Sequence, residues 1–308
     1  MMKYNFARQS PVRVCFTGKS RAGAWEIRGR QISKTRLNWE CVDVLNEKDF
    51  SKFDLVCFVK KPSLPLLEQL HAAKKPMCYD IVDSWAQPDD NSKCSDRIAA
   101  QNLFEKKWKS YPFFSYIFPN RTMQADLSGL TPHYVTIYHH YRPCIEKIKV
   151  NQDVKRIGYE GNVAYLGEWQ EVMERICDQR GFEFVTNPDD FSSIDIGFAA
   201  RGGIHNCFLA NRYKSNVKLA NFIGAGMPCI VSAREMSCHE TDPGGVRFFE
   251  TEKQLECQVD KLLNYDLRVK IHEDFLANRH QFSVEKAADL YDYYFQTVLM
   301  LIRQGAMI

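Results

Sequence analysis

The sequence has little that would tie it to a membrane, a zinc ribbon or a disulfide framework. Its 11 cysteines form no Cys-x-x-Cys pair, so neither a zinc ribbon nor a disulfide-rich domain is predicted. We expect them to be small buried hydrophobes in a reducing compartment. No apolar run reaches the roughly 18 residues that span a bilayer, and no signal peptide opens the chain. We therefore expect no transmembrane segment and a cytoplasmic location.

A large excess of charge of one sign is also missing. The chain has 41 basic and 38 acidic residues, which gives a formal net charge of +3. This balance does not favour general electrostatic binding to nucleic acid or to a membrane surface, although a local anion site is still allowed. At 308 residues the chain is long for one core, and two domains are the default expectation.

A Gly-Lys-Ser triplet at residues 18–20 invites comparison with a P-loop, but that motif needs a glycine five positions earlier, where Arg13 stands. The sequence therefore does not predict an ATPase. What remains is a strand at residues 12–17 and a glycine-rich basic turn, which can offer amides and cations to a phosphate or a sugar. A solvated basic loop, with the tryptophan packed in the core, is the alternative. The candidates in this acceptor or phosphate loop are Gly18, Lys19, Arg21, Gly23, Trp25 and Arg28.

Short apolar runs alternate with helical stretches along the whole chain. The first half has expected strands at residues 12–17, 41–45, 54–59, 77–82, 115–118 and 134–138. A polar segment at residues 142–154 is the candidate linker, and a second alternation follows it. The pattern is typical of an α/β protein with two Rossmann-like, doubly wound parallel-sheet domains that face a cleft. We place the domains at residues 1–145 and 146–285, with a C-terminal helix at residues 286–308.

The stretch at residues 212–232 has the pattern of a basic entry loop, a short helix, a Gly-Ala-Gly stop and a buried strand. Ser215 or Asn216 can cap the helix, because a short polar side chain accepts from the free amides of the first turn. Three cations surround the predicted helix start: Arg212, Lys214 and Lys218. A helix N-terminus with these neighbours can receive an anion.

Residues 218–228, KLANFIGAGMP, are similar to the Lys-Leu-x-Glu-x-x-Ala-x-Gly-x-Pro helix of GT-B glycosyltransferases, in the broad group of sucrose-synthase and glycogen-synthase relatives. The glycine-rich turn, the segment YHHYRP at residues 138–143 and the segment FSVEKA at residues 282–287 support the resemblance. It implies a GT-B architecture over nearly the whole chain, with the last helix crossing back to the N-terminal domain. It also implies a nucleotide diphosphate sugar held by the C-terminal domain, and a glycan or small-molecule acceptor held by the N-terminal domain.

The resemblance also implies roles for single residues in the donor site. The residues expected at the leaving diphosphate are Arg201, Lys214, Ser215 and Lys218, and those expected at the nucleoside are Glu160 and Asn221. Asn221 stands where the family has a glutamate that grips the ribose hydroxyls, and an amide can still hydrogen-bond a diol. Asn162 stands where the family has an arginine.

Three side chains are candidates for the reaction itself: Asp83, His139 and His140. Asp83 can act as the base of an inverting reaction, and capping of the following helix is its alternative role. A histidine can serve as a base or bind the transferred sugar, but successive strand residues point to opposite faces, so at most one should face the cleft. Structural roles for both histidines are the alternative. The sequence leaves retention and inversion of configuration open.

No two aspartates are separated by exactly one residue, so the Asp-x-Asp metal clamp of the other main glycosyltransferase architecture is absent. Cations and helix amides would then assist departure of the nucleoside diphosphate. The sequence thus predicts a metal-independent glycosyltransferase without a cofactor. A transferase acting on nucleic-acid bases and a catalytically silent GT-B protein that binds a nucleotide or a glycan remain alternatives.

Overall fold

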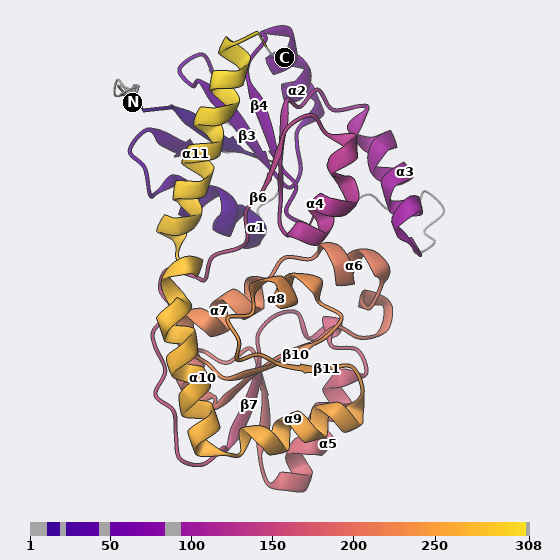
Figure 1. Ribbon diagram of the computed structural model, residues 1–308, viewed down its shortest axis with the longest axis vertical. Coiled ribbons are helices and arrows are strands. Elements are labelled where there is room, and N and C mark those ends of the chain that lie inside the picture. The colour runs from indigo at the N-terminus through magenta and orange to yellow at the C-terminus, as the bar shows by residue number, and fades with distance from the viewer. Residues whose placement is uncertain (1–10, 19–22, 43–49, 84–93, 306–308) are drawn as a thin grey trace, which may run out of the picture.

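The computed structural model describes residues 11–18, 23–42, 50–83 and 94–305. They form two α/β lobes stacked along the long axis of the molecule (Figure 1). The N-terminal lobe has a six-stranded sheet in the order β2-β1-β3-β4-β5-β6, and the C-terminal lobe has a five-stranded sheet in the order β11-β10-β9-β7-β8. Every strand pairing among the described residues is parallel. The predicted pair of doubly wound parallel sheets is confirmed.

The first lobe contains most of the elements that the sequence predicts, with ends shifted by a few residues. Its strands are β1 Val14–Thr17, β2 Trp39–Cys41, β3 Leu55–Val59, β4 Met77–Asp80, β5 Ser115–Phe118 and β6 Tyr134–Thr136. Its helices are α1 Gly23–Trp25, the π-helix η1 Glu26–Gln31, α2 Leu64–Ala72, α3 Arg97–Trp108, α4 Arg121–Leu127 and the 3-10 turn η2 Ser128–Leu130.

The second lobe begins after a linker, residues 137–155, that contains no helix or strand. Its strands are β7 Arg156–Tyr159, β8 Glu183–Thr186, β9 Ile196–Ala199, β10 Cys229–Ser232 and β11 Arg247–Phe249. Its helices are α5 Trp169–Arg180, α6 Phe208–Tyr213, α7 Val217–Ala225, α8 Met236–Thr241, α9 Glu252–Leu262 and α10 Tyr265–Asn278. Short 3-10 turns are η3 Val163–Tyr165, η4 Phe191–Ser193, η5 Gly203–His205 and η6 Arg279–Phe282.

The last helix, α11 Val284–Arg303, leaves the C-terminal lobe and packs along the N-terminal one (Figure 1). Ser283 caps it by accepting a hydrogen bond from the amide of Lys286 at 3.1 Å. Its buried face belongs to the hydrophobic core of the N-terminal lobe, where the rings of Tyr291 and Phe295 lie 5.8 and 5.9 Å from that of Phe16. The expected crossing of the last helix is confirmed.

A fully buried ionic network lies beneath this helix. The Arg28 guanidinium donates to both carboxylate oxygens of Asp80, at 2.9 and 3.1 Å, and to the carbonyl oxygens of Ile137 and Tyr138. The Tyr291 hydroxyl donates to the same carboxylate. The network therefore joins η1, the end of β4, the start of the linker and α11.

Helix α4 docks the two lobes against each other. The Glu240 carboxylate, at the end of α8, accepts from the amides of Arg121 and Thr122 at 2.7 and 2.8 Å and so caps α4. Arg212 of α6 donates to both carboxylate oxygens of Asp126 on α4, at 2.9 and 3.1 Å. Arg212 therefore binds the other lobe. It does not lie at the start of α7, where the sequence had placed it.

The linker lies directly on α7. A Cβ atom added to Gly224 would lie 2.5 Å from Cγ of Tyr141, so a side chain at this position would collide with the linker. Gly226 ends the helix at φ 68°, a left-handed conformation that favours glycine. Within the described ranges, no helix is both long and apolar enough to cross a membrane.

Candidate active site

The candidate site lies where strand ends of the N-terminal lobe meet the start of α7. Arg201 follows β9, Lys214 follows α6, and Lys218 is in the first turn of α7. Burial and, to a lesser degree, the charges of Arg201 and Lys214 lower the pKa of Lys218, so the three cations lie within electrostatic range of one another. The three cations predicted to bind the diphosphate thus come from three separate parts of the C-terminal lobe.

The Lys218 ammonium has few neighbours that compensate for the loss of its hydration. Its nitrogen is buried and has no hydrogen-bond partner among the described residues, and it lies 3.9 Å from the centroid of the Tyr159 ring. Burial lowers the pKa of Lys218 to about 7, an effect that the Glu235 carboxylate partly opposes. A buried, unpaired donor is costly unless a ligand satisfies it.

Arg201 is only 7% exposed, and its Nε lies 3.5 Å from Oε1 of Glu235, which is also buried. Its guanidinium carbon lies 5.5 Å from the centroid of the Tyr165 ring. The Glu235 carboxylate thus lies near two of the three cations, Arg201 and Lys218. Neither Glu235 nor Tyr159 was predicted from the sequence to belong to the site.

The start of α7 contributes free backbone donors, as the first turn of any helix does. Its N-cap residue is Asn216, whose side chain does not cap the helix. The Asn216 Oδ1 accepts instead from the amide of His139 at 3.0 Å, across the two lobes, and its buried Nδ2 has no partner among the described residues. Ser215 is buried beside it. Cations and unpaired N–H donors therefore surround the helix start.

Lys214 reaches across the lobes to Asp83, which follows β4. The Lys214 ammonium binds one carboxylate oxygen of Asp83, and Nζ of Lys60 lies 2.8 Å from the other. Burial alone would raise the pKa of Asp83, but the two ammonium groups hold it well below its ordinary value. Lys60 was not among the predicted site residues, although its place after β3 fits the rule that ligand-binding groups follow strand ends.

The two adjacent histidines have different environments. The ring nitrogens of His140 lie 2.8 and 3.1 Å from the carbonyl oxygens of Tyr141 and Ile27, so both are engaged by the scaffold. His139 is 2% exposed, and its Nδ1 has no partner among the described residues. Burial, reinforced by the nearby Arg28 charge, lowers the pKa of His139 well below its ordinary value, so the ring is neutral at pH 7. Of the two, only His139 keeps an unpaired ring nitrogen.

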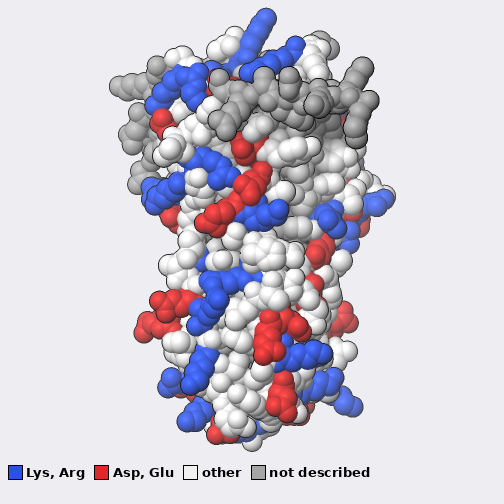
Figure 2. All heavy atoms as spheres, turned by 60° about the vertical axis from the view of Figure 1, so that its left-hand side comes forward, with Lys and Arg blue, Asp and Glu red and all other residues white. Residues whose placement is uncertain are grey.

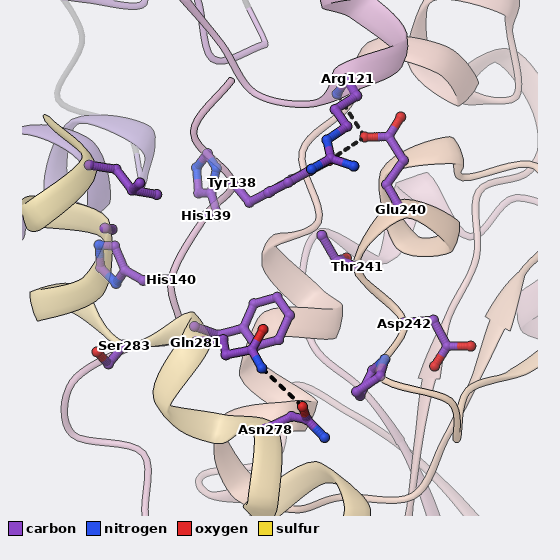
Figure 3. A pocket seen from close by; sticks show the side chains of 14 residues that line it. Arg121, Tyr138, His139, His140, Glu240, Thr241, Asp242, Asn278, Gln281 and Ser283 are labelled. Atoms are coloured by element: carbon purple, nitrogen blue, oxygen red, sulfur yellow. Dashed lines mark hydrogen bonds between the residues drawn. The ribbon is translucent and has the colours of Figure 1, made fainter. Parts of the chain in front are cut away.

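A cavity of about 270 Å³ lies beside these histidines, between α8, the end of α10, the start of α11 and the linker (Figure 3). Figure 3 shows Glu240 and Tyr138 on one side of it and Gln281 and Asn278 on another. His139 and His140 line this cavity, but Arg201, Lys214 and Lys218 do not. The cavity is therefore next to the cation cluster and separate from it.

The predicted nucleoside contacts are engaged in an internal network. Asn221 accepts from the amide of Arg142 at 3.1 Å and donates to Oε2 of Glu160 at 3.1 Å. The Arg142 guanidinium binds the other oxygen of Glu160 at 2.9 Å. Asn221 and Gly224, one helical turn apart in α7, both face the linker. Contact with the linker therefore explains the amide at residue 221 and the missing side chain at residue 224.

Among the described residues predicted for the acceptor or phosphate loop, Trp25 and Arg28 are buried within the N-terminal lobe. A Cβ on Gly18 would lie 2.6 Å from the carbonyl oxygen of Val59, so the glycine permits a close backbone approach, and Gly23 begins α1. The structure places Trp25 in the hydrophobic core, and Arg28 is buried against Asp80. Lys19 and Arg21 lie outside the described residues.

Charged side chains of both signs are interspersed over the face of the molecule that Figure 2 presents. This view shows no extended basic surface of the kind that binds a nucleic-acid backbone. Among the described residues, no group of three or more His, Cys, Asp and Glu side chains is placed to hold a metal ion.

Neither a protein-family model nor a curated protein matches the sequence. Solved structures do resemble the fold. The E. coli trehalose-6-phosphate structure bound with UDP-2-fluoro glucose aligns with a TM-score of 0.56 at 8% identity, over 93% of this chain and 99% of that chain. An alpha,alpha-trehalose 6-phosphate synthase from Burkholderia multivorans gives 0.54 at 10% identity, over 82% and 72%.

A glycosyltransferase involved in avilamycin A biosynthesis aligns with a TM-score of 0.53 at 9% identity, over 94% of this chain and 98% of that chain. At such identities the likeness concerns the fold alone. The described residues of this chain have the two parallel α/β lobes and the returning C-terminal helix that the sequence predicts. The chain has the GT-B fold of glycosyltransferases.

Proposed function

We propose that the protein is a glycosyltransferase that moves a sugar from a nucleotide diphosphate sugar to a glycan or small-molecule acceptor, without a metal ion. The observation that carries the proposal is the buried ammonium of Lys218, which has no hydrogen-bond partner among the described residues and lies beside Arg201 and Lys214 at the start of α7. A diphosphate would supply the missing acceptor atoms and the missing negative charge.

The chemistry follows from this placement. The bond between the sugar C1 and the diphosphate oxygen breaks and a bond from C1 to an acceptor oxygen forms. The acceptor hydroxyl gives its proton to the leaving diphosphate in a retaining reaction, or to a side-chain base in an inverting one. Negative charge grows on the leaving diphosphate, where the cations and the α7 amides stabilise it more strongly than in the ground state. Retention needs no side-chain base, and for inversion His139 is the group with an unpaired ring nitrogen.

A second candidate is a catalytically silent GT-B protein that binds a nucleotide or a glycan. The network of Asn221, Glu160 and Arg142 favours it, because the amide expected at the ribose already has two partners within the protein. This candidate and the transferase both predict nucleotide binding. They differ in whether sugar is released or transferred.

A thermal-shift panel of UDP, GDP, ADP, CMP and dTDP sugars tests the proposal, because a ligand of the folded state raises the melting temperature by mass action. The expected result is a shift with at least one diphosphate donor that Lys218→Met abolishes. Lys253→Met, at an exposed position on α9, is the matched control and should keep the shift. A panel without any shift would contradict the proposal. Binding without turnover, over a range of acceptors, would favour the silent protein.

A further inference from the structure

Two strained backbone positions flank the ionic contact between the lobes. Lys60, directly after β3, has φ 64°, and Val82, directly before Asp83, has φ 54°. For a β-branched residue such as Val82 a positive φ is a genuine outlier that persists only where the surroundings enforce it. Strain of this kind clusters at functional sites, which makes the ends of β3 and β4 worth closer inspection.

The strained segment at Lys60 is held by hydrogen bonds on both sides. Its amide donates to the carbonyl oxygen of Asp80 at 2.9 Å, and its carbonyl oxygen accepts from the Tyr79 hydroxyl at 2.8 Å. With the backbone fixed in this way, the Lys60 ammonium lies 2.8 Å from the Asp83 carboxylate. The ion pair between Lys60 and Asp83 therefore lies entirely within the N-terminal lobe.

Lys214 completes the contact from the C-terminal lobe. Its ammonium binds the second oxygen of Asp83, and its own carbonyl oxygen accepts from Nδ2 of Asn120 in the N-terminal lobe at 3.1 Å. Side chain and backbone of Lys214 are thus both fixed by the opposite lobe. A long, flexible lysine would otherwise sample many rotamers beside the cation cluster.

We propose that Asp83 is a positioning residue: it holds the Lys214 ammonium at the donor diphosphate and does not take the acceptor proton. An ammonium group lies within ion-pair distance of each carboxylate oxygen, and the two positive charges make Asp83 a weak base. The inference rests on the proposed function and deepens it, because it gives the carboxylate that binds Lys214 across the lobes a role in donor binding.

The charges of the site support this role. Among the described residues, four cations, Lys60, Arg201, Lys214 and Lys218, face two carboxylates, Asp83 and Glu235, which leaves a formal surplus of two positive charges when Lys218 is protonated. A nucleotide diphosphate sugar carries two negative charges and so balances the site. Neutralising Asp83 would increase the surplus and strengthen binding of a nucleoside diphosphate, even while it releases Lys214 from its position.

A double-mutant cycle of Asp83→Asn and Lys214→Met tests the inference in two readouts. In a transfer assay with the donor found by the thermal-shift panel, each single variant should lower kcat at least about tenfold, and the double variant should be no worse than Lys214→Met. In calorimetry with the nucleoside diphosphate of that donor, Asp83→Asn should bind about fivefold more tightly than the wild type, whereas the double variant should not. A residue with only a structural role would not tighten product binding.

The opposite results would overturn the inference. Additive losses of kcat would show that Asp83 acts independently of Lys214, as a base does, and unchanged or weaker product binding by Asp83→Asn would contradict the charge argument. A measurement without any donor separates failure of this inference from failure of the proposed function. Asp83 and Lys214 should show coupling in equilibrium unfolding well above that of the exposed pair Arg156 and Glu183, whether or not any nucleotide binds. Coupling no larger than that of the exposed pair also contradicts the bridge.

Discussion

Replacing Lys218 with methionine should strengthen the unliganded fold and weaken donor binding, two effects of opposite sign from one change. The ammonium nitrogen is buried without a hydrogen-bond partner among the described residues, so the folded protein carries the cost of its desolvation. Methionine has a similar length, a good helix propensity and no charge to bury. The same ammonium is the group that a bound diphosphate would use.

The pKa of Lys218 sets the magnitude. Burial lowers it from the ordinary 10.5 to about 7, which corresponds to a cost of roughly 4 kcal/mol at pH 7. Contact with the Tyr159 ring and hydration of the side-chain stem offset part of this cost. We therefore expect Lys218→Met to raise the free energy of unfolding by roughly 2–3 kcal/mol, or several degrees in melting temperature. Loss of a charge-assisted hydrogen bond should weaken donor binding roughly 10- to 100-fold.

The pH dependence of the free energy of unfolding tests the predicted direction of this stability change a second time. The unfolded lysine binds its proton more tightly than the folded one, so the wild type gains stability as pH rises from 7 toward 10.5. The advantage of Lys218→Met should be largest at pH 7 and below, and should be nearly gone at pH 10.5. Denaturant unfolding of both proteins at several pH values measures it. A destabilised Lys218→Met protein, or an advantage that does not change with pH, would refute the reasoning.

Three further changes test other parts of the structure by thermal or denaturant unfolding. Asn221→Asp should destabilise the protein by roughly 1–3 kcal/mol at neutral pH and less in acid, because a carboxylate would replace the amide that donates to Glu160; equal stability at both pH values would count against this. Gly224→Ala should destabilise by roughly 1–2 kcal/mol despite its better helix propensity, since the new Cβ meets Tyr141 at 2.5 Å, and a stabilised variant would disprove that contact. Asp80→Ala should cost roughly 3–5 kcal/mol, because it leaves a buried guanidinium unpaired; a loss below about 1 kcal/mol would contradict the buried network.

Local pattern predicted most of the longer elements, because the buried strands are short apolar runs and the helices α3, α9, α10 and α11 begin at side chains that cap them. The prediction also placed Lys214 and Lys218 near the start of α7, since a helix start is a local feature. Helices α4, α6 and α8 were not predicted, because they are short and much of their stabilisation comes from contacts between the lobes.

The parts of the site that escaped prediction depend on partners far away in the sequence. Arg28 has the pattern of a loop cation until Asp80 is seen beside it, 52 residues further on. Asn216 has the pattern of a helix cap, but its side chain binds the amide of His139, 77 residues away. Lys60 carried no signal of its own apart from its place after a strand. Pairings of this kind depend on tertiary geometry, which composition and periodicity do not contain.

A crystal structure of the protein with the nucleoside diphosphate of its best-binding donor tests the central claim most directly. We predict that the diphosphate lies within hydrogen-bond distance of the Lys218 ammonium and the first amides of α7, with Arg201 and Lys214 beside it. A diphosphate bound elsewhere, for example in the cavity of about 270 Å³ next to His140, would contradict it.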